Sequence, residues 1–134
     1  MDDCPLCASR DGPAIWRDDR LRVISAAEAD YPGFVRVVWN AHVREMSDLA
    51  AGDRAHCMRI VFAVEEALCA GMKPSKVNLA SLGNQVPHVH WHVIPRHPGD
   101  AHFPDPVWAA RRRPGAPLHF DVARFLDDFI RALG

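Results

Sequence analysis

The chain has 134 residues, of which 49% are hydrophobic, and this length predicts one domain with its own core. The formal net charge of −1 gives no overall basic field, so neither nucleic acid nor a membrane surface is expected as a partner. No apolar run is long enough to span a bilayer, and the acidic start of the chain lacks the features of a signal peptide. We therefore expect a cytoplasmic protein with reduced cysteines.

The first half of the chain predicts a cysteine pair, three strands and a long helix. Cys4 and Cys7 form a C-x-x-C pair, which is half of many zinc sites; a redox pair fits less well, because no thioredoxin-like strand and helix surround it. Strands are expected over 14–17, 21–25 and 34–39, followed by a short turn capped by Ser47. The long helix is expected over 53–70, with Gly71 at its C-terminal end. Its predicted buried residues are Met58, Val61, Phe62, Leu68, Cys69 and Met72, with Cys57 also buried.

The second half predicts a β-hairpin, a long loop and a final helix. The hairpin is formed by strands over 76–80 and 87–95, joined through Gly83 and Asn84. The loop over 97–120 is rich in proline, and its aromatic residues either cover a bound substrate or only pin the loop to the body. The run Arg111-Arg112-Arg113 is either solvated or a guide for polyphosphate. A helix over 121–133 follows, capped by Asp121.

Five consecutive residues, His88-Val89-His90-Trp91-His92, carry most of the functional information. In a strand, alternate side chains share a face, so the three imidazoles would form a row while Trp91 points to the core. Such a row can hold a metal or handle a phosphoryl group, with one histidine as nucleophile and another as acid. A zinc hydrolase with all three as ligands is disfavoured, because His88 and His92 would lie about 13 Å apart along an unbent strand.

This segment resembles the His-φ-His-φ-His-φ-φ signature of the histidine triad (HIT) superfamily. The similarity extends to Asn78, to Gly83-Asn84-Gln85-Val86 and to Pro95-Arg96, and covers about residues 4–96. It implies an α+β, HIT-like fold: a single domain over 1–134, with about five antiparallel strands, one long helix and a C-terminal helix. The core would span about 4–96, followed by the loop over 97–120 and the helix over 121–133.

The resemblance also implies an activity. The family cleaves nucleotide derivatives at the α-phosphate, as hydrolases or transferases, through a covalent nucleotidyl-histidine. By motif position His90 is the nucleophile, His92 assists the leaving group, and His88 completes the catalytic set. The side chains of Asn78, Asn84 and Gln85 would bind phosphate oxygens, although turn chemistry alone could also explain these three amides. Phosphoramidates and dinucleoside polyphosphates are the expected substrates.

Three further expectations follow from the same resemblance. Metal-binding relatives join a C-x-x-C pair to two histidines, which here gives a structural zinc site of Cys4, Cys7, His42 and His88. A homodimer is expected. One departure is Phe34, which stands where many relatives carry a histidine that supports the nucleophile. This departure leaves a non-catalytic nucleotide-binding module as the alternative function.

Overall fold

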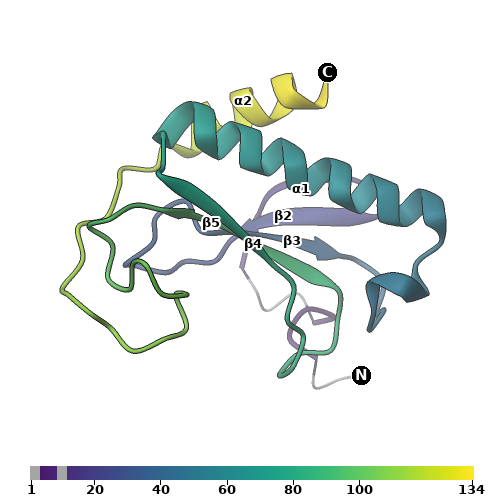
Figure 1. Cartoon of the computed structure of the whole chain (residues 1–134). Coiled ribbons are helices and arrows are strands. Elements are labelled where there is room, and N and C mark those ends of the chain that lie inside the picture. The colour runs from purple at the N-terminus through teal and green to yellow at the C-terminus, as the bar shows by residue number, and fades with distance from the viewer. Residues whose placement is uncertain (1–3, 9–11) are drawn as a thin grey trace.

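A five-stranded antiparallel sheet and two α-helices form the fold of the computed structural model, which describes residues 4–8 and 12–134 (Figure 1). The strands are β1 (Ala14–Arg17), β2 (Leu21–Ser25), β3 (Val35–Trp39), β4 (Lys76–Ala80) and β5 (His90–Arg96). The helices are the 3₁₀ turn η1 (Met46–Asp48), α1 (Ala51–Met72) and α2 (Val122–Leu133). The predicted α+β fold, with its long helix and C-terminal helix, is therefore confirmed.

The order of the strands places the histidine strand inside the sheet. The order is β1-β2-β3-β5-β4, so β5 pairs with β3 on one side and with β4 on the other. The register sets Val38 opposite His90 and Arg36 opposite His92. Because directly paired residues point to the same face, Arg36 lies beside His92 on that face.

Both α-helices lie on one side of the sheet (Figure 1). Helix α1 packs on the sheet through residues spaced three or four apart, and α2 packs against α1 with Phe125 and Phe129 buried. Valines of β2, β3 and β5 point into this core beneath the helices. His90 and His92 alternate with core-facing residues along β5, so they point to the opposite face of the sheet. Within residues 4–8 and 12–134, the face that carries the histidines is therefore covered by no helix. Two irregular segments, around residues 4–8 and 97–117, contact it instead.

Several predicted details of the helices are wrong. Helix α1 ends two residues later than expected, at Met72, and the residue at its C-terminal cap is Lys73, in the left-handed conformation (φ 50°), rather than Gly71. Phe62 is 50% exposed and Cys69 is exposed, because the buried face follows Cys57, Ile60 and Val64. Ser47 lies within η1, and the residue at the N-terminal cap is Glu45. In contrast, Asp121 caps α2 as expected, accepting a hydrogen bond from the Arg124 N–H.

The loop between β5 and α2 contains neither helix nor strand and is organised around one buried carboxylate. Asp100 accepts hydrogen bonds from the Arg96 guanidinium, from the Tyr31 hydroxyl and from the N–H groups of His97, His102 and Phe103. Burial alone would raise the pKa of Asp100, but these donors hold it well below its usual value.

The basic run within this loop binds the loop itself and Asp30, which lies between β2 and β3. The Arg113 guanidinium donates to the main-chain oxygens of Asp100 (2.6 Å) and Phe103 (2.9 Å). Arg112 pairs with Asp105, and Arg111 pairs with Asp30. These contacts favour a structural role over that of a polyphosphate guide. Among the described residues, no helix is both long and apolar enough to cross a membrane.

Candidate active site and metal site

The three histidines do not form the single row that a continuous strand would give. Strand β5 begins at His90, whereas the sequence predicted a start at residue 87, so His88 precedes the strand. Val89 makes main-chain hydrogen bonds to Val43 and Trp39, which fixes the chain just before β5. All three imidazoles are buried, with exposed fractions of 1% for His88, 8% for His90 and 6% for His92.

His90 is oriented by the main chain of its own motif. Its Nδ1 lies 2.6 Å from the carbonyl oxygen of His88. A carbonyl can only accept, so Nδ1 carries the proton and Nε2 keeps its lone pair. The Ser81 hydroxyl also donates to the main-chain oxygen of His90, at 2.7 Å. Burial lowers the pKa of His90, which favours the neutral imidazole.

His92 lies among one cation and two aromatic rings. The Nε of Arg36 is 3.4 Å from Nδ1 of His92, a long hydrogen bond that leaves the His92 proton on Nε2. The rings of Phe34 and Trp108 contact the imidazole edge to face, with centroids 5.7 and 5.1 Å away. Burial, His90 and Arg36 together lower the pKa of His92 to about 4. His92 is therefore a neutral hydrogen-bond donor near pH 7.

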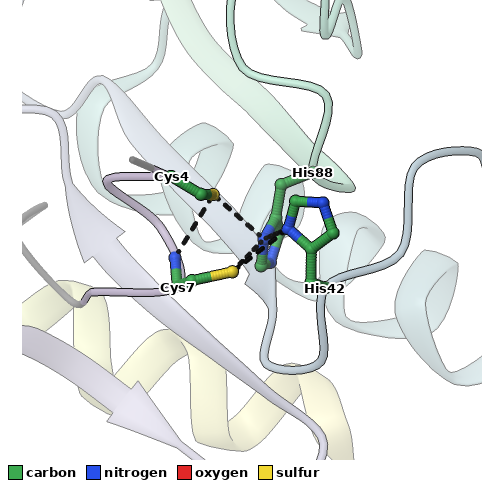
Figure 2. A group of neighbouring side chains, drawn as sticks. All are labelled: Cys4, Cys7, His42 and His88. Carbon is green, nitrogen blue, oxygen red and sulfur yellow. Dashed lines mark hydrogen bonds between the residues drawn. The ribbon is translucent and has the colours of Figure 1, made fainter. Parts of the chain in front are cut away.

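His88 turns its ring toward a different group of side chains, shown in Figure 2. Its Nδ1 lies 3.5 Å from the Sγ atoms of both Cys4 and Cys7, and 3.2 Å from Nδ1 of His42. The Sγ of Cys7 is 3.1 Å from Nδ1 of His42. Four potential ligand atoms from three distant segments thus lie within 4.8 Å of one another.

These distances fit a tetrahedral zinc ion. With Zn–N near 2.05 Å and Zn–S near 2.3 Å, tetrahedral angles separate two nitrogens by about 3.3 Å and a nitrogen from a sulfur by about 3.6 Å. His88 is also prepared as a ligand, because its Nε2 donates to the Trp39 carbonyl at 2.5 Å and so leaves Nδ1 unprotonated. Burial lowers the pKa of His88, which again favours the neutral, metal-binding form. The four residues can therefore hold a metal ion.

A buried arginine supports the cysteine segment from behind. Arg22 donates to the main-chain oxygen of Leu6 at 2.7 Å and to the side chain of Asn40 at 3.1 Å. Leu6 itself packs on Ile24 and Val38. The segment that carries Cys4 and Cys7 is thereby joined to the sheet and to the turn that leads to His42.

A cavity of about 520 Å³ lies in front of His90 and His92. Its lining consists of Pro5, Leu6, Arg36, Leu82, Gly83, Asn84, Gln85, Val86, His90, His92 and Trp108. Of the predicted substrate-binding amides, Asn84 and Gln85 thus lie at the same cavity as the nucleophile candidate. Asn78 does not; its Oδ1 accepts from the Arg96 guanidinium at 2.8 Å, and it borders a separate cavity. His88 is also absent from the lining, because its ring faces the cysteines.

Sequence reasoning missed several residues of this cavity. Arg36 was not among the predicted site residues, because only the register between β3 and β5 shows that it faces His92. Pro5 and Leu6 could be placed there only once the cysteine pair was positioned in space. The aromatic content of the loop did signal Trp108, which borders both cavities.

Comparison with known proteins identifies the family. The model of the HIT domain matches residues 9–99, about two thirds of the chain. The chain therefore belongs to the HIT, or histidine triad, family, and its sheet and helices match the fold of solved family members. Membership supports a role in nucleotide processing, in a family that typically consists of hydrolases or transferases.

Several solved structures are similar to this chain. A histidine triad protein from Bradyrhizobium japonicum is 32% identical, with a TM-score of 0.71, and the match covers 94% of this chain and 90% of that one. A histidine triad protein from Sinorhizobium meliloti is 26% identical, with a TM-score of 0.75 and coverage of 90% and 91%. A zinc-bound family member from Mycobacterium smegmatis is 24% identical, with a TM-score of 0.64 and coverage of 98% and 94%. A search of curated proteins finds no match.

Proposed function

We propose that the protein is an enzyme that cleaves nucleotide derivatives at the α-phosphate, with His90 as the nucleophile. The observation that carries this proposal is the hydrogen bond from His90 Nδ1 to the His88 carbonyl, 2.6 Å long. It fixes the ring beside a cavity of nucleotide size and reserves the lone pair of Nε2 for attack. The lowered pKa of His90 keeps that lone pair available at neutral pH.

The reaction consists of two displacements at phosphorus. In the first, Nε2 of His90 forms a bond to the α-phosphorus, and the bond from phosphorus to the leaving group breaks with its electron pair. The attacking imidazole becomes positively charged, and the His88 carbonyl stabilises this charge through the Nδ1 proton. In the second, water or another acceptor attacks phosphorus and releases its proton to solvent, and the bond to Nε2 breaks with its electron pair to restore the neutral ring.

The remaining residues of the cavity have distinct proposed roles. The Nε2–H of His92 donates a hydrogen bond to the bridging atom of the leaving group. The side-chain amides of Asn84 and Gln85 donate to non-bridging phosphate oxygens, and neither makes a hydrogen bond to another described residue. His88 acts through its carbonyl rather than its ring. Asn78 acts indirectly, by orienting Arg96.

We further propose that Cys4, Cys7, His42 and His88 hold a structural zinc ion. The interatomic distances fit a closed tetrahedral Cys₂His₂ set, and the similar protein from Mycobacterium smegmatis is zinc-bound. When bound, zinc would cross-link the N-terminal segment to the sheet and leave no open coordination position for substrate.

We also propose that the protein is a homodimer, as the family resemblance implies, and that it acts in the cytoplasm.

The test is a hydrolysis screen followed by substitution of the nucleophile. Purified protein is offered nucleoside phosphoramidates, dinucleoside polyphosphates, aminoacyl adenylates and sugar nucleotides. We expect turnover of at least one class and its loss in His90→Ala, whereas calorimetry still detects binding of the nucleoside monophosphate product. His119→Ala, at an exposed histidine outside the cavity, is the matched control. Binding without any turnover by the wild-type protein would establish the alternative, a non-catalytic nucleotide-binding module.

A further inference from the structure

The cavity in front of His90 contains a cation without a counter-charge. Arg36 is one of the lining residues, and within the described part of the chain no carboxylate pairs with its guanidinium. The lining residues include no aspartate or glutamate at all. The protein as a whole has a net charge of −1, so this positive region reflects local placement rather than composition. An uncompensated guanidinium on a cavity wall favours an anionic ligand.

Arg36 is held in place by groups that do not neutralise it. Its guanidinium carbon lies 5.7 Å from the centre of the Phe34 ring, in cation–π contact. Its Nε donates to His92, which is a neutral acceptor. The buried Phe34 therefore supports both Arg36 and His92 at a position where many relatives would place a histidine. The two terminal Nη groups of Arg36 make no hydrogen bond within the described residues, so their donors are available to a ligand.

The position of Arg36 beside His92 places Arg36 near the leaving group of the substrate. His92 is the group proposed to face the leaving group, and the β3–β5 register sets Arg36 directly beside it. Arg36 is thus placed to meet the leaving group rather than the base or ribose of the nucleotide. A planar guanidinium binds phosphate through parallel hydrogen bonds, and it does so without accepting or giving a proton.

The state of His92 limits the leaving groups that the site can expel. An amine leaving group must gain a proton as its bond to phosphorus breaks, because the amide anion is far too basic to depart. Burial, His90 and Arg36 keep His92 neutral near pH 7. A neutral imidazole can donate a hydrogen bond, but it is a poor source of the proton that a departing amine requires. A phosphate leaving group takes the electron pair of the broken P–O bond and departs as a stable anion, and it needs no proton.

We propose that Arg36 is a catalytic residue that binds an anionic leaving group, so that the preferred substrates are nucleotides joined to phosphate or polyphosphate rather than phosphoramidates. The inference rests on the proposed function. In the first displacement the P–O bridge bond breaks, and the charge that develops on the departing phosphate is neutralised by the Arg36 guanidinium. Arg36 acts by the same principle as an oxyanion-hole donor.

The experiment compares two substrates that share the nucleotidyl group. Diadenosine triphosphate has an anionic leaving group, and adenosine 5′-phosphoramidate has an amine. kcat/KM is measured on both for the wild-type protein and for Arg36→Met, Arg36→Lys and Arg54→Met. Arg54 is an exposed residue of α1, outside the cavity, and serves as the matched control. Circular dichroism and thermal melting establish that each variant is folded.

We expect the wild-type protein to prefer the triphosphate. Arg36→Met should lower kcat/KM on the triphosphate about a hundredfold and on the phosphoramidate less than threefold, with partial recovery in Arg36→Lys. Arg54→Met should match the wild-type protein. Equal losses on both substrates, or a wild-type preference for the phosphoramidate, would overturn the inference and leave the proposed function intact. No turnover of either substrate would overturn the inference, whereas the proposed function is overturned only if all four substrate classes of the screen fail.

Discussion

The ring nitrogens of the three triad histidines contact different partners. His88 uses both of its nitrogens, one toward the cysteine pair and one on the Trp39 carbonyl. His90 uses one on the His88 carbonyl, and His92 uses one on Arg36. Only His90 and His92 therefore have a nitrogen left for a ligand in the cavity. This division follows from the start of β5 at His90, which lets His88 turn away from its neighbours.

The lowered pKa of His92 predicts how stability depends on pH. In the unfolded chain this histidine binds a proton near its ordinary pKa of 6.5, whereas in the folded protein it does so only near pH 4. The unfolded state therefore binds more protons between these values, and stability falls as pH decreases from about 6.5 to about 4. The contribution of His92 to this loss is at most about 3 kcal/mol. Urea unfolding at several pH values measures it.

Substitution isolates the contribution of His92 from that of other groups. His92→Asn should show a shallower fall in the free energy of unfolding with decreasing pH than the wild-type protein, whereas His119→Asn should keep the wild-type slope. Arg36→Met should also raise the pKa of His92 in an NMR titration, because Arg36 is one of the groups that lower it. Identical slopes in His92→Asn and the wild-type protein would contradict this account of the site.

At the scale of elements, the long loop is fixed by Asp100 rather than by regular structure. The side chain of Asp100 is 0% exposed and that of Arg96 is 3% exposed, so their ion pair is shielded from water. The same loop presents Trp108 to His92. We therefore expect the order of the loop and the shape of the cavity in front of His92 to depend on this one carboxylate.

Removal of that carboxylate should be costly. Asp100→Ala leaves the Arg96 guanidinium buried without its partner, and we expect the free energy of unfolding to fall by about 3–5 kcal/mol. Asp127→Ala, at an exposed aspartate of α2, should change it by less than about 0.5 kcal/mol. Urea denaturation followed by far-UV circular dichroism measures both. A loss below 1 kcal/mol in Asp100→Ala would show that the loop does not depend on this pair.

The N-terminal segment links the candidate metal site to the cavity in front of His90. Cys4 and Cys7 flank Pro5 and Leu6, and these two residues form part of the cavity wall. Loss of metal should therefore affect substrate binding as well as stability. We predict about one zinc ion per chain, and in Cys4→Ser a lower melting temperature together with a raised KM.

The exposed Cys69 provides the control for this prediction. Cys69→Ser should retain the zinc content, melting temperature and KM of the wild-type protein. Elemental analysis of protein purified without chelator measures the metal, and calorimetry measures the melting temperature. Protein without zinc, or equal melting temperatures for the two serine variants, would contradict a structural metal site.

At the scale of the whole molecule, the order and type of the elements could be predicted from alternation in the strands, turn residues and helix ends, although the apolar periodicity of α1 is weak. The alternation in β5 and the cap at Asp121 are local signals that the tertiary structure keeps. The errors arise where tertiary packing decides. The rotation of α1 on the sheet exposes Phe62 and Cys69, although both are apolar enough to be core residues.

The candidate site could be predicted only in part, for a similar reason. The C-x-x-C spacing and the family resemblance were sufficient to nominate the four metal ligands, which the structure brings together. Arg36 could not be recognised, because its role depends on a register between strands more than 50 residues apart in the chain. Asn78 was assigned to the phosphate by motif position, but its side chain meets Arg96, a contact that no local pattern reports.

The covalent bond that we propose between His90 and the α-phosphorus can be detected by mass spectrometry. The protein is mixed with a substrate that it turns over, quenched within milliseconds under alkaline conditions that preserve phosphohistidine, and examined by intact-mass and peptide mass spectrometry. We predict an added nucleoside monophosphate on the peptide that contains residues 88–92, with fragment ions that assign it to His90 and no adduct in His90→Ala. An adduct on His88 or His92, or rapid turnover without any adduct, would contradict the account.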